Sequence, residues 1–280
     1  MTKTLLFLSV FASGLASAQE DLLKDIDTLK TTTETSQPAF KALQIVTGQS
    51  TKLSAKNEWY IVVAHRFGDV STGFKNFFGL DDASTKLGVI YGITDKISVS
   101  LSRETNLKTF EGAVKYKLIN QTENFPADIV GYNVMALNTD LDKDNYPHLK
   151  FSDRLAYLTQ ALISRRFNDQ FSLQLTPSFV HKNLYDPAIE DKNQFLTGLG
   201  GRYKISKRIS LNAEYFVNFD NHSFYKNPLS LGIDIETGGH VFQLLFTNSQ
   251  LNSDIGYLSN AAGKWEKGQI FFGFNLYRVF

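Results

Sequence analysis

The sequence predicts an all-β fold, an antiparallel transmembrane β-barrel of about twelve strands with a short N-terminal periplasmic arm. Three observations support this fold class. The chain ends in a segment where Phe272, Phe274 and Phe280 fall on one side of a two-residue repeat. Successive hairpins carry long apolar faces without the charged residues that soluble sheets place there. Short and long connections alternate along the chain.

Residues 1–57 precede the predicted barrel. Lys3, an apolar run over residues 5–15 and small residues up to Ala18 have the organisation of a secretory signal peptide, residues 1–18. The run is shorter than the roughly 20 residues of a membrane-spanning helix. Residues 19–57 are mostly polar, with leucine and isoleucine at helical spacing over residues 21–29. We expect a periplasmic arm with a short helix over residues 19–57; folding of this arm into the barrel mouth is the alternative.

The composition excludes several classes of protein. The net charge is +1 and no basic run is present, so we expect no nucleic-acid partner. The chain has no cysteine, which excludes thiol chemistry. Mean hydropathy is −0.19. Because a barrel strand is apolar only at every second position, a membrane barrel has the average hydropathy of a soluble protein.

From residue 58 onward the chain reads as strands, which predicts a barrel domain over residues 58–280. Tight connections at residues 94–95, 168–169, 207–208 and 238–239 alternate with long ones at residues 68–85, 141–153, 184–193, 220–228 and 250–268. Outer-membrane barrels have this asymmetry, with tight turns on the periplasmic side and long loops outside. The predicted strands cover residues 59–67, 86–93, 96–103, 112–119, 128–138, 154–167, 170–182, 194–205, 209–219, 229–237, 240–249 and 269–280.

Gly238 and Gly239 predict a two-residue hairpin turn, because glycine readily adopts the positive φ that such turns need. The register that follows pairs Thr237 with His240, Ile235 with Phe242, Ile233 with Leu244, and Leu231 with Phe246. These pairs form one apolar face, and Asp234 and Glu236 belong to the other face. Turn chemistry and hydrophobic pattern therefore agree in this hairpin.

A second hairpin repeats this pattern. A three-residue loop after Ile93 pairs it with Ile97 and turns Ser98, Ser100 and Ser102 to the opposite face. The strand predicted over residues 154–167 has no clear polar face, and its orientation is left unassigned. A soluble β-sandwich is the alternative fold, in which the polar faces would be surface; in a barrel they face the lumen.

Charged residues of both signs fall on the predicted inner face. The lumen-lining set is Lys115, Lys117, Arg202, Lys204, Glu214, Asp234 and Glu236. One interpretation is a filled interior in which these groups form ion pairs and hydrogen bonds. The other is a water-filled path whose selectivity they determine. The alternating pattern fits both.

Histidines and acidic residues give two further candidate sites. His65, His181 and His222 are expected near the outer rim, where an outer-membrane hydrolase would carry its active site. Hydrogen bonding at the rim is the alternative role for such strand-end histidines. Residues 140–144 alternate aspartates like the start of a calcium loop, but Asn145 stands where that loop needs glycine. We therefore predict no metal site, no catalytic residue and no cofactor.

Five segments carry a resemblance to a known family: HRFG at residues 65–68, FFGLD at 77–81, YGITD at 91–95, GRYK at 201–204 and NPLSLGIDIETGGHVFQLLFTNS at 227–249. They resemble Bacteroidetes-type outer-membrane β-barrel proteins of unassigned function. The resemblance spans almost the whole mature chain and implies a β-barrel in the cell envelope. It implies no catalytic or binding residue.

These observations predict a barrel in the cell outer membrane that acts as a passive pore or envelope transport component for small polar solutes, and not an enzyme. An outer-membrane hydrolase with a rim active site and a closed structural barrel are the alternatives. The expected partners are outer-membrane lipid, a small solute and the barrel-assembly machinery, which would recognise the C-terminal strand ending at Phe280. An open lumen and a plugged lumen fit the sequence equally.

Overall fold

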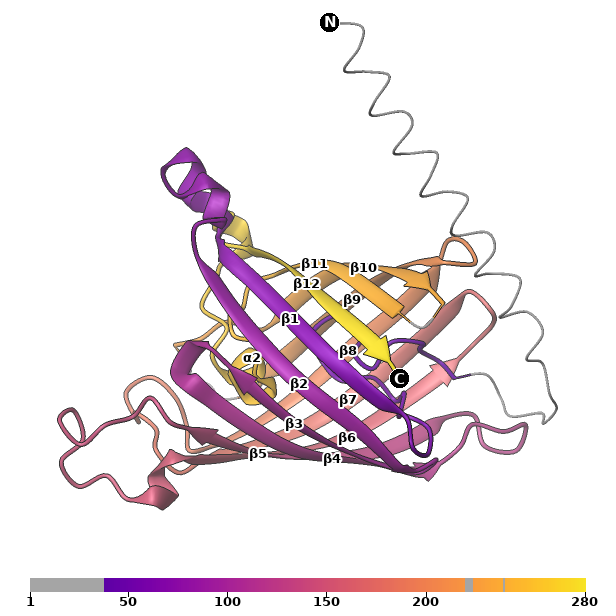
Figure 1. Cartoon of the computed structure of the whole chain (residues 1–280), viewed down its shortest axis with the longest axis horizontal. Coiled ribbons are helices and arrows are strands. Elements are labelled where there is room, and N and C mark those ends of the chain that lie inside the picture. Colours follow the sequence, from indigo (N-terminus) through magenta and orange to yellow (C-terminus); the bar gives the residue numbers. More distant parts are fainter. Residues whose placement is uncertain (1–37, 220–223, 239) are drawn as a thin grey trace, which may run out of the picture. The chain divides into compact units, whose positions relative to one another are not determined.

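The chain forms a closed antiparallel β-barrel in the computed structural model, which describes residues 38–219, 224–238 and 240–280 (Figure 1). Each strand pairs with its sequence neighbours, and β1 pairs with β12 to close the wall. Over the described residues the strands are β1 (Trp59–Asp69), β2 (Ala83–Thr94), β3 (Ile97–Glu104), β4 (Thr109–Ile119), β5 (Asp128–Asn138), β6 (Leu155–Arg166), β7 (Phe171–Lys182), β8 (Asn193–Lys204), β9 (Ile209–Asn218), β10 (Leu229–Thr237), β11 (His240–Thr247) and β12 (Phe271–Val279). The predicted fold class is confirmed.

The connections separate by length onto the two ends of the barrel. The turns after β2, β6, β8 and β10 are short and lie at one end, the short-turn end; the segments after β1, β5, β7, β9 and β11 are long and lie at the other, the long-loop end. Two connections depart from this rule: the one after β4 is longer than the others at the short-turn end, and the one after β3 is shorter than the others at the long-loop end. Short helices lie in connections at the long-loop end: η1 (Val70–Gly79), η2 (Asn106–Lys108), η3 (Phe151–Arg154), α2 (Asp254–Ser259) and η4 (Trp265–Lys267).

The register of the β10–β11 hairpin agrees with the prediction at every pair from Thr237 with His240 to Leu231 with Phe246. Gly238 has a φ of 52°, as the turn requires. In the β2–β3 hairpin, the predicted pairing of Ile93 with Ile97 is wrong, because the register shifts and Thr94 takes that place. The shift follows Gly92, whose backbone is hydrogen-bonded to the segment before β1.

Apolar side chains cover the outward face of the wall, as a lipid-facing surface requires. Ile233 is 41% exposed, and its β11 partner Leu244 shares that outward face. β6, whose orientation the sequence left unassigned, turns Leu158 and Leu162 inward, where both are buried. They face inward because the interior contains an apolar core as well as polar groups.

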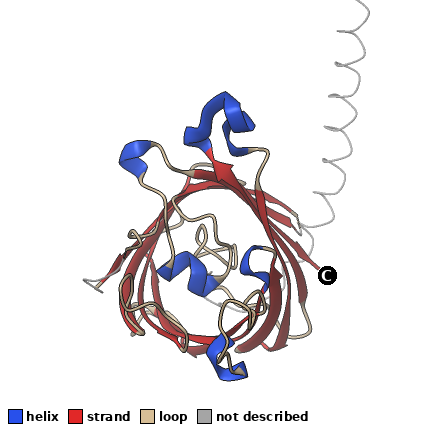
Figure 2. Ribbon diagram, turned by 90° about the vertical axis from the view of Figure 1, so that its left-hand side faces the viewer, coloured by secondary structure: helices blue, strands red, loops and turns tan. Residues whose placement is uncertain are grey.

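Two chain segments fill the interior of the ring of strands (Figure 2). The N-terminal plug is residues 38–57, and the loop plug is residues 248–263 of the β11–β12 connection, which includes α2. Leu53 of the first and Ile255 of the second are buried in one apolar cluster with the wall. The described part of the predicted periplasmic arm therefore lies in the interior. The predicted signal peptide and short helix fall outside the described residues.

Within the described ranges, no helix has both the length and the apolar character needed to cross a bilayer.

Candidate functional site

The N-terminal plug makes a tight turn inside the barrel. Its Ile45 N–H donates to the Gly48 carbonyl at 2.8 Å, which closes the tip of the turn. The chain enters at the short-turn end, where the Lys56 N–H donates to Asp95 in the β2–β3 turn at 3.0 Å. The plug therefore fills the barrel from that end.

Glu214 on β9 holds the tip of this turn. Its Oε1 atom accepts hydrogen bonds from the backbone N–H groups of Thr47 at 2.6 Å and Gly48 at 2.8 Å. The carboxylate is buried, and hydrogen bonds to charged groups contribute about 1.5–3 kcal/mol each. One wall residue thus fixes the innermost part of the plug.

Glycines in the wall make room for the N-terminal plug. A Cβ atom at Gly200 would lie 2.6 Å from Cδ1 of Ile45, and one at Gly92 would lie 1.8 Å from the carbonyl oxygen of Ala55. A glycine inside a strand often marks a close approach of another segment. Here that segment is the N-terminal plug.

Lys115 on β4 holds the backbone of the same plug. Its Nζ atom donates to the carbonyls of Leu43 at 3.3 Å, Ser50 at 3.1 Å and Lys52 at 3.3 Å. All three acceptors belong to the N-terminal plug, so Lys115 would lose them if the plug moved away. The plug brings its own cation into the interior, and burial lowers the pKa of Lys52 below its usual value.

Two wall carboxylates hold the start of α2 in the loop plug. Glu104 on β3 accepts from the N–H groups of Asn252 at 2.5 Å and Ser253 at 3.0 Å. Glu111 on β4 accepts from the Asp254 N–H at 2.8 Å. The first N–H groups of a helix have no partner within the helix, and the barrel wall supplies one.

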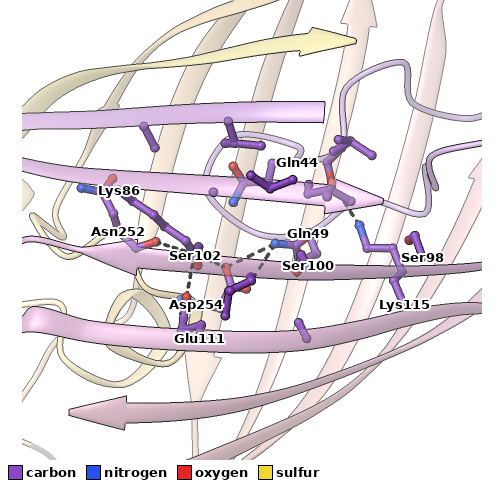
Figure 3. Close-up of a pocket in the computed structure, with 18 of the residues that line it drawn as sticks. Gln44, Gln49, Lys86, Ser98, Ser100, Ser102, Glu111, Lys115, Asn252 and Asp254 are labelled. Atoms are coloured by element: carbon purple, nitrogen blue, oxygen red, sulfur yellow. Dashed lines mark hydrogen bonds and ion pairs between the residues drawn. The ribbon is translucent and has the colours of Figure 1, made fainter. Parts of the chain in front are cut away.

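Asp254 of the loop plug contacts both the wall and the N-terminal plug (Figure 3). Lys86 Nζ on β2 lies 2.6 Å from Glu111 and 3.7 Å from Asp254. The Tyr132 hydroxyl donates to Asp254 at 2.5 Å. From the N-terminal plug, the Gln49 amide donates to both Asp254 carboxylate oxygens at 3.3 Å. The two plugs therefore touch each other in the middle of the barrel.

The plugs also share Glu214. The Tyr257 hydroxyl of α2 donates at 2.9 Å to the same Oε1 atom that accepts from Thr47 and Gly48. Burial raises the pKa of Tyr257 well above its usual value, so the hydroxyl stays protonated and remains a donor. Loss of either plug would remove partners from this buried carboxylate, which couples the positions of the two plugs.

The space around the plugs differs between the centre of the barrel and its long-loop end. A cavity of about 50 Å³ lies between the plugs and the inner faces of β1 to β4, and it has room for a few water molecules. A hollow of about 590 Å³ opens at the long-loop end, lined by the β5–β6 and β7–β8 loops and by α2. The cavity beside the plugs is therefore much smaller than the hollow at the long-loop end.

The seven residues predicted to line the lumen lie on the inward side of their strands. Lys115, Arg202, Glu214 and Asp234 are buried, whereas Lys117, Lys204 and Glu236 are partly exposed near the short-turn end. The structure brings Arg202 to 2.9 Å from Glu236, which also pairs with Lys41 of the N-terminal plug at 2.6 Å. Lys117 pairs instead with Asp128 at 3.1 Å. The role of these seven residues in solute passage stays a prediction.

Sequence reasoning missed several charged residues of the interior. Arg66, Lys86, Glu104, Glu111 and Asp254 are buried on the inner side of the wall or in the loop plug. The alternating pattern could have found Arg66, because it continues the inward-facing series of Val62 and Ala64. Asp254 carried no such signal, because its long connection resembles any loop outside the barrel.

The candidate rim histidines occupy outward positions. His65 on β1 stacks on Phe274 at 5.3 Å between ring centres, and its Nδ1 atom contacts the Thr85 hydroxyl at 2.9 Å. His181 on β7 contacts the side chains of Asn193 and Asn183 at 2.6 and 3.0 Å. His222 lies outside the described residues. Across the described part of the chain, no group of three His, Cys, Asp or Glu residues is placed to hold a metal ion.

Comparisons with known proteins agree with this architecture. Residues 40–280 match the sequence model of a family described as "Membrane bound beta barrel domain (DUF5777)". The predicted resemblance is confirmed as far as a membrane-bound β-barrel family; the Bacteroidetes-type origin stays a prediction. No curated protein sequence matches the chain significantly.

Two solved structures have a similar fold. One is the NanC porin, at a TM-score of 0.50 and 10% identity, with 79% of this chain and 98% of that chain covered. The other is the KdgM porin in complex with disordered oligogalacturonate, at a TM-score of 0.52 and 9% identity, with 79% and 99% covered. At these identities the likeness is one of fold.

Proposed function

This chain belongs to that family of membrane-bound β-barrel domains, and from this premise we propose that it is an outer-membrane pore for small polar solutes. In the described conformation the N-terminal plug and the loop plug close the pore. Opening requires that at least one plug leaves the wall.

The polar chemistry of the wall behind the plugs carries this proposal. Lys86, Glu104, Glu111, Lys115 and Glu214 belong to the wall and contact the plugs through hydrogen bonds and ion pairs. A permanently filled interior gains little from such groups, because well-packed apolar residues are often as stable as buried charges or more so. If the plugs leave and water fills the barrel, charged side chains on the wall have a function, because such side chains line water-filled channels.

The barrel architecture supports an outer-membrane location. A closed wall leaves no unpaired strand edge in the bilayer, and tight turns at one end with long loops at the other are typical of outer-membrane barrels. We also propose that barrel-assembly machinery recognises β12 together with Phe280, whose ring is exposed. Deletion of Phe280 is then expected to lower the yield of assembled barrel in cells, and an unchanged yield would contradict this role.

A reversible crosslink tests whether the N-terminal plug closes the pore. Thr51 Oγ1 in the plug and Ser164 Oγ on β6 are 2.6 Å apart, and the chain has no native cysteine. The double variant Thr51→Cys/Ser164→Cys can therefore form one disulfide between plug and wall. In planar bilayers we expect the oxidised protein to show no conductance steps, and the reduced protein to show steps like those of the wild type.

The single variant Ser164→Cys is the matched control, and its conductance should not respond to oxidation. Steps that persist in protein shown by gel to be crosslinked would contradict closure by the N-terminal plug. Bilayers that stay silent for the wild type and for the reduced variant would favour the closed structural barrel.

A further inference from the structure

We infer that solutes pass along the inward face of β3, and that this route favours small anions. The inference rests on the pore proposed above, and it adds a path and a solute class. The path follows the cavity between the plugs and the inner faces of β1 to β4 (Figure 3).

Ser98, Ser100 and Ser102 form a row of hydroxyls along this path. They alternate on β3, and all three line the cavity. Within the described residues, none of these hydroxyls has a hydrogen-bond partner in the protein. Polar groups of this kind need water or a solute to satisfy them. Two hydroxyls of the opposite wall are occupied: Ser164 by Thr51 at 2.6 Å and Ser178 by Gln160 at 2.9 Å.

The path is narrow in the closed state, and the N-terminal plug forms its other side. Gly88, the β2 partner of Ser102, has no side chain to fill the space. Gln44 and Gln49 of the plug line the cavity facing the serines. Withdrawal of the plug would therefore widen this cavity along its whole length.

The charge along the path favours anions. Arg66, Lys86 and Lys115 line the cavity, against the carboxylates Glu111 and Asp254. Lys86 is already paired with Glu111 at 2.6 Å. Arg66 and Lys115 then face one remaining carboxylate, Asp254, so these lining groups carry a surplus of one positive charge. Fixed charges in a narrow space raise the local concentration of ions of opposite sign.

Arg66 and Lys115 are also poised to bind an anion. Arg66 is only 1% exposed; its Nη1 atom donates to backbone and amide oxygens, and its Nε atom has no partner among the described residues. Lys115 is held by the plug carbonyls of Leu43, Ser50 and Lys52. When the plug withdraws, an anion can replace those carbonyls at the ammonium group.

Thiol labelling tests the path. Ser100→Cys places the chain's one thiol on the proposed route, and Ser178→Cys places it on the opposite inner wall. During conductance recording we expect a methanethiosulfonate reagent to block Ser100→Cys and to leave Ser178→Cys unaffected. An anionic reagent should react with Ser100→Cys about tenfold faster than a cationic one of similar size. Ser102→Cys repeats the test if Ser100→Cys fails to assemble.

Ion selectivity tests the role of Lys115. In a potassium chloride gradient, the reversal potential of the wild type should show that chloride is more permeant than potassium. The variant Lys115→Gln should lower the permeability ratio of chloride to potassium about threefold or more. Lys96→Gln makes the same exchange in the exposed β2–β3 turn and should leave the preference unchanged.

The possible outcomes distinguish a failure of the proposed path from a failure of the proposed pore. Block of Ser178→Cys with no effect on Ser100→Cys would overturn the path while the pore stands. A wild-type preference for potassium would overturn the anion assignment. If neither the wild type nor the reduced crosslink variant conducts, the pore itself fails, and the path fails with it.

Discussion

Gln49 and Asp254 lie 205 positions apart in the chain, and the Gln49 amide donates to both carboxylate oxygens of Asp254 at 3.3 Å. One residue belongs to the segment that enters at the short-turn end, and the other to the segment that enters at the long-loop end. A displacement of either plug therefore changes the surroundings of the other. This contact, together with the shared Glu214, makes the two plugs a coupled pair.

Neutralising Glu214 should loosen both plugs at once. Glu214→Gln keeps an acceptor oxygen but weakens its bonds to Thr47, Gly48 and Tyr257 by removing the charge. We expect docking to lose about 1–3 kcal/mol, and the open probability in single-channel recordings to rise about tenfold or more. The control Asp169→Asn alters a fully exposed carboxylate in the β6–β7 turn. Equal open probabilities in the two variants would contradict the role of Glu214.

Adding one methyl group at Gly92 should displace the N-terminal plug. Its Cβ would lie 1.8 Å from the backbone oxygen of Ala55, which no side-chain rotation can relieve. For Gly92→Ala we expect faster proteolysis before residue 57 and more frequent channel opening. Gly112→Ala is the matched control, because a Cβ at Gly112 meets no atom within 4 Å. Proteolysis at the same rate in both variants would show that the plug is not packed against Gly92.

An arginine on the outward face should destabilise the barrel more in the middle of the membrane than near its surface. Leu199 lies in the middle of β8, and Tyr203 lies near its end on the same exposed face. We expect Leu199→Arg to cost about 2–4 kcal/mol in folding into lipid vesicles, and Tyr203→Arg about 0–1 kcal/mol. Urea titrations of vesicle-embedded protein, read by heat-modifiable migration on gels, measure this difference. Similar losses in both variants would argue against a lipid-facing wall.

Docking of the N-terminal plug should strengthen as pH rises. Burial lowers the pKa of Lys52 in the docked plug, whereas an undocked Lys52 keeps its ordinary pKa of about 10.4. Between those two pKa values the undocked state binds more protons, so raising the pH favours docking. We expect open probability to fall as the pH rises toward the ordinary lysine pKa of about 10.4.

The variant Lys52→Met should show a weaker dependence of open probability on pH. Lys56→Met removes an exposed lysine from the same plug, and it should behave like the wild type. A pH response that is identical in all three proteins would assign the effect to another group.

The barrel itself could be predicted because its signals are local. Alternation fixes which residues of a strand share a face, and the Gly238 turn fixes the β10–β11 register. The error at Ile93 has a non-local cause: the neighbouring Gly92 is hydrogen-bonded to the segment before β1, and no pattern within the hairpin reveals this.

The plugs could not be predicted for the same physical reason. Their partners in the wall are distant in sequence, and many contacts use plug backbone groups, which have no sequence signature. Thr47 and Gly48 contribute their N–H groups to Glu214, so nothing in their side chains marks the contact. The inner face was predicted to carry Glu214 and Lys115, but the sequence does not show that both bind a plug.

The pairing of β1 with β12 determines the order of events in assembly. Tyr60 near the start of the wall pairs with Val279 near its end, so the ring can shut only after the last strand has been made. The N-terminal plug continues directly into β1 and is synthesised long before that moment. The plug must therefore either be inside the barrel when β1 pairs with β12, or enter later through the short-turn end. These two assembly pathways should have different intermediates.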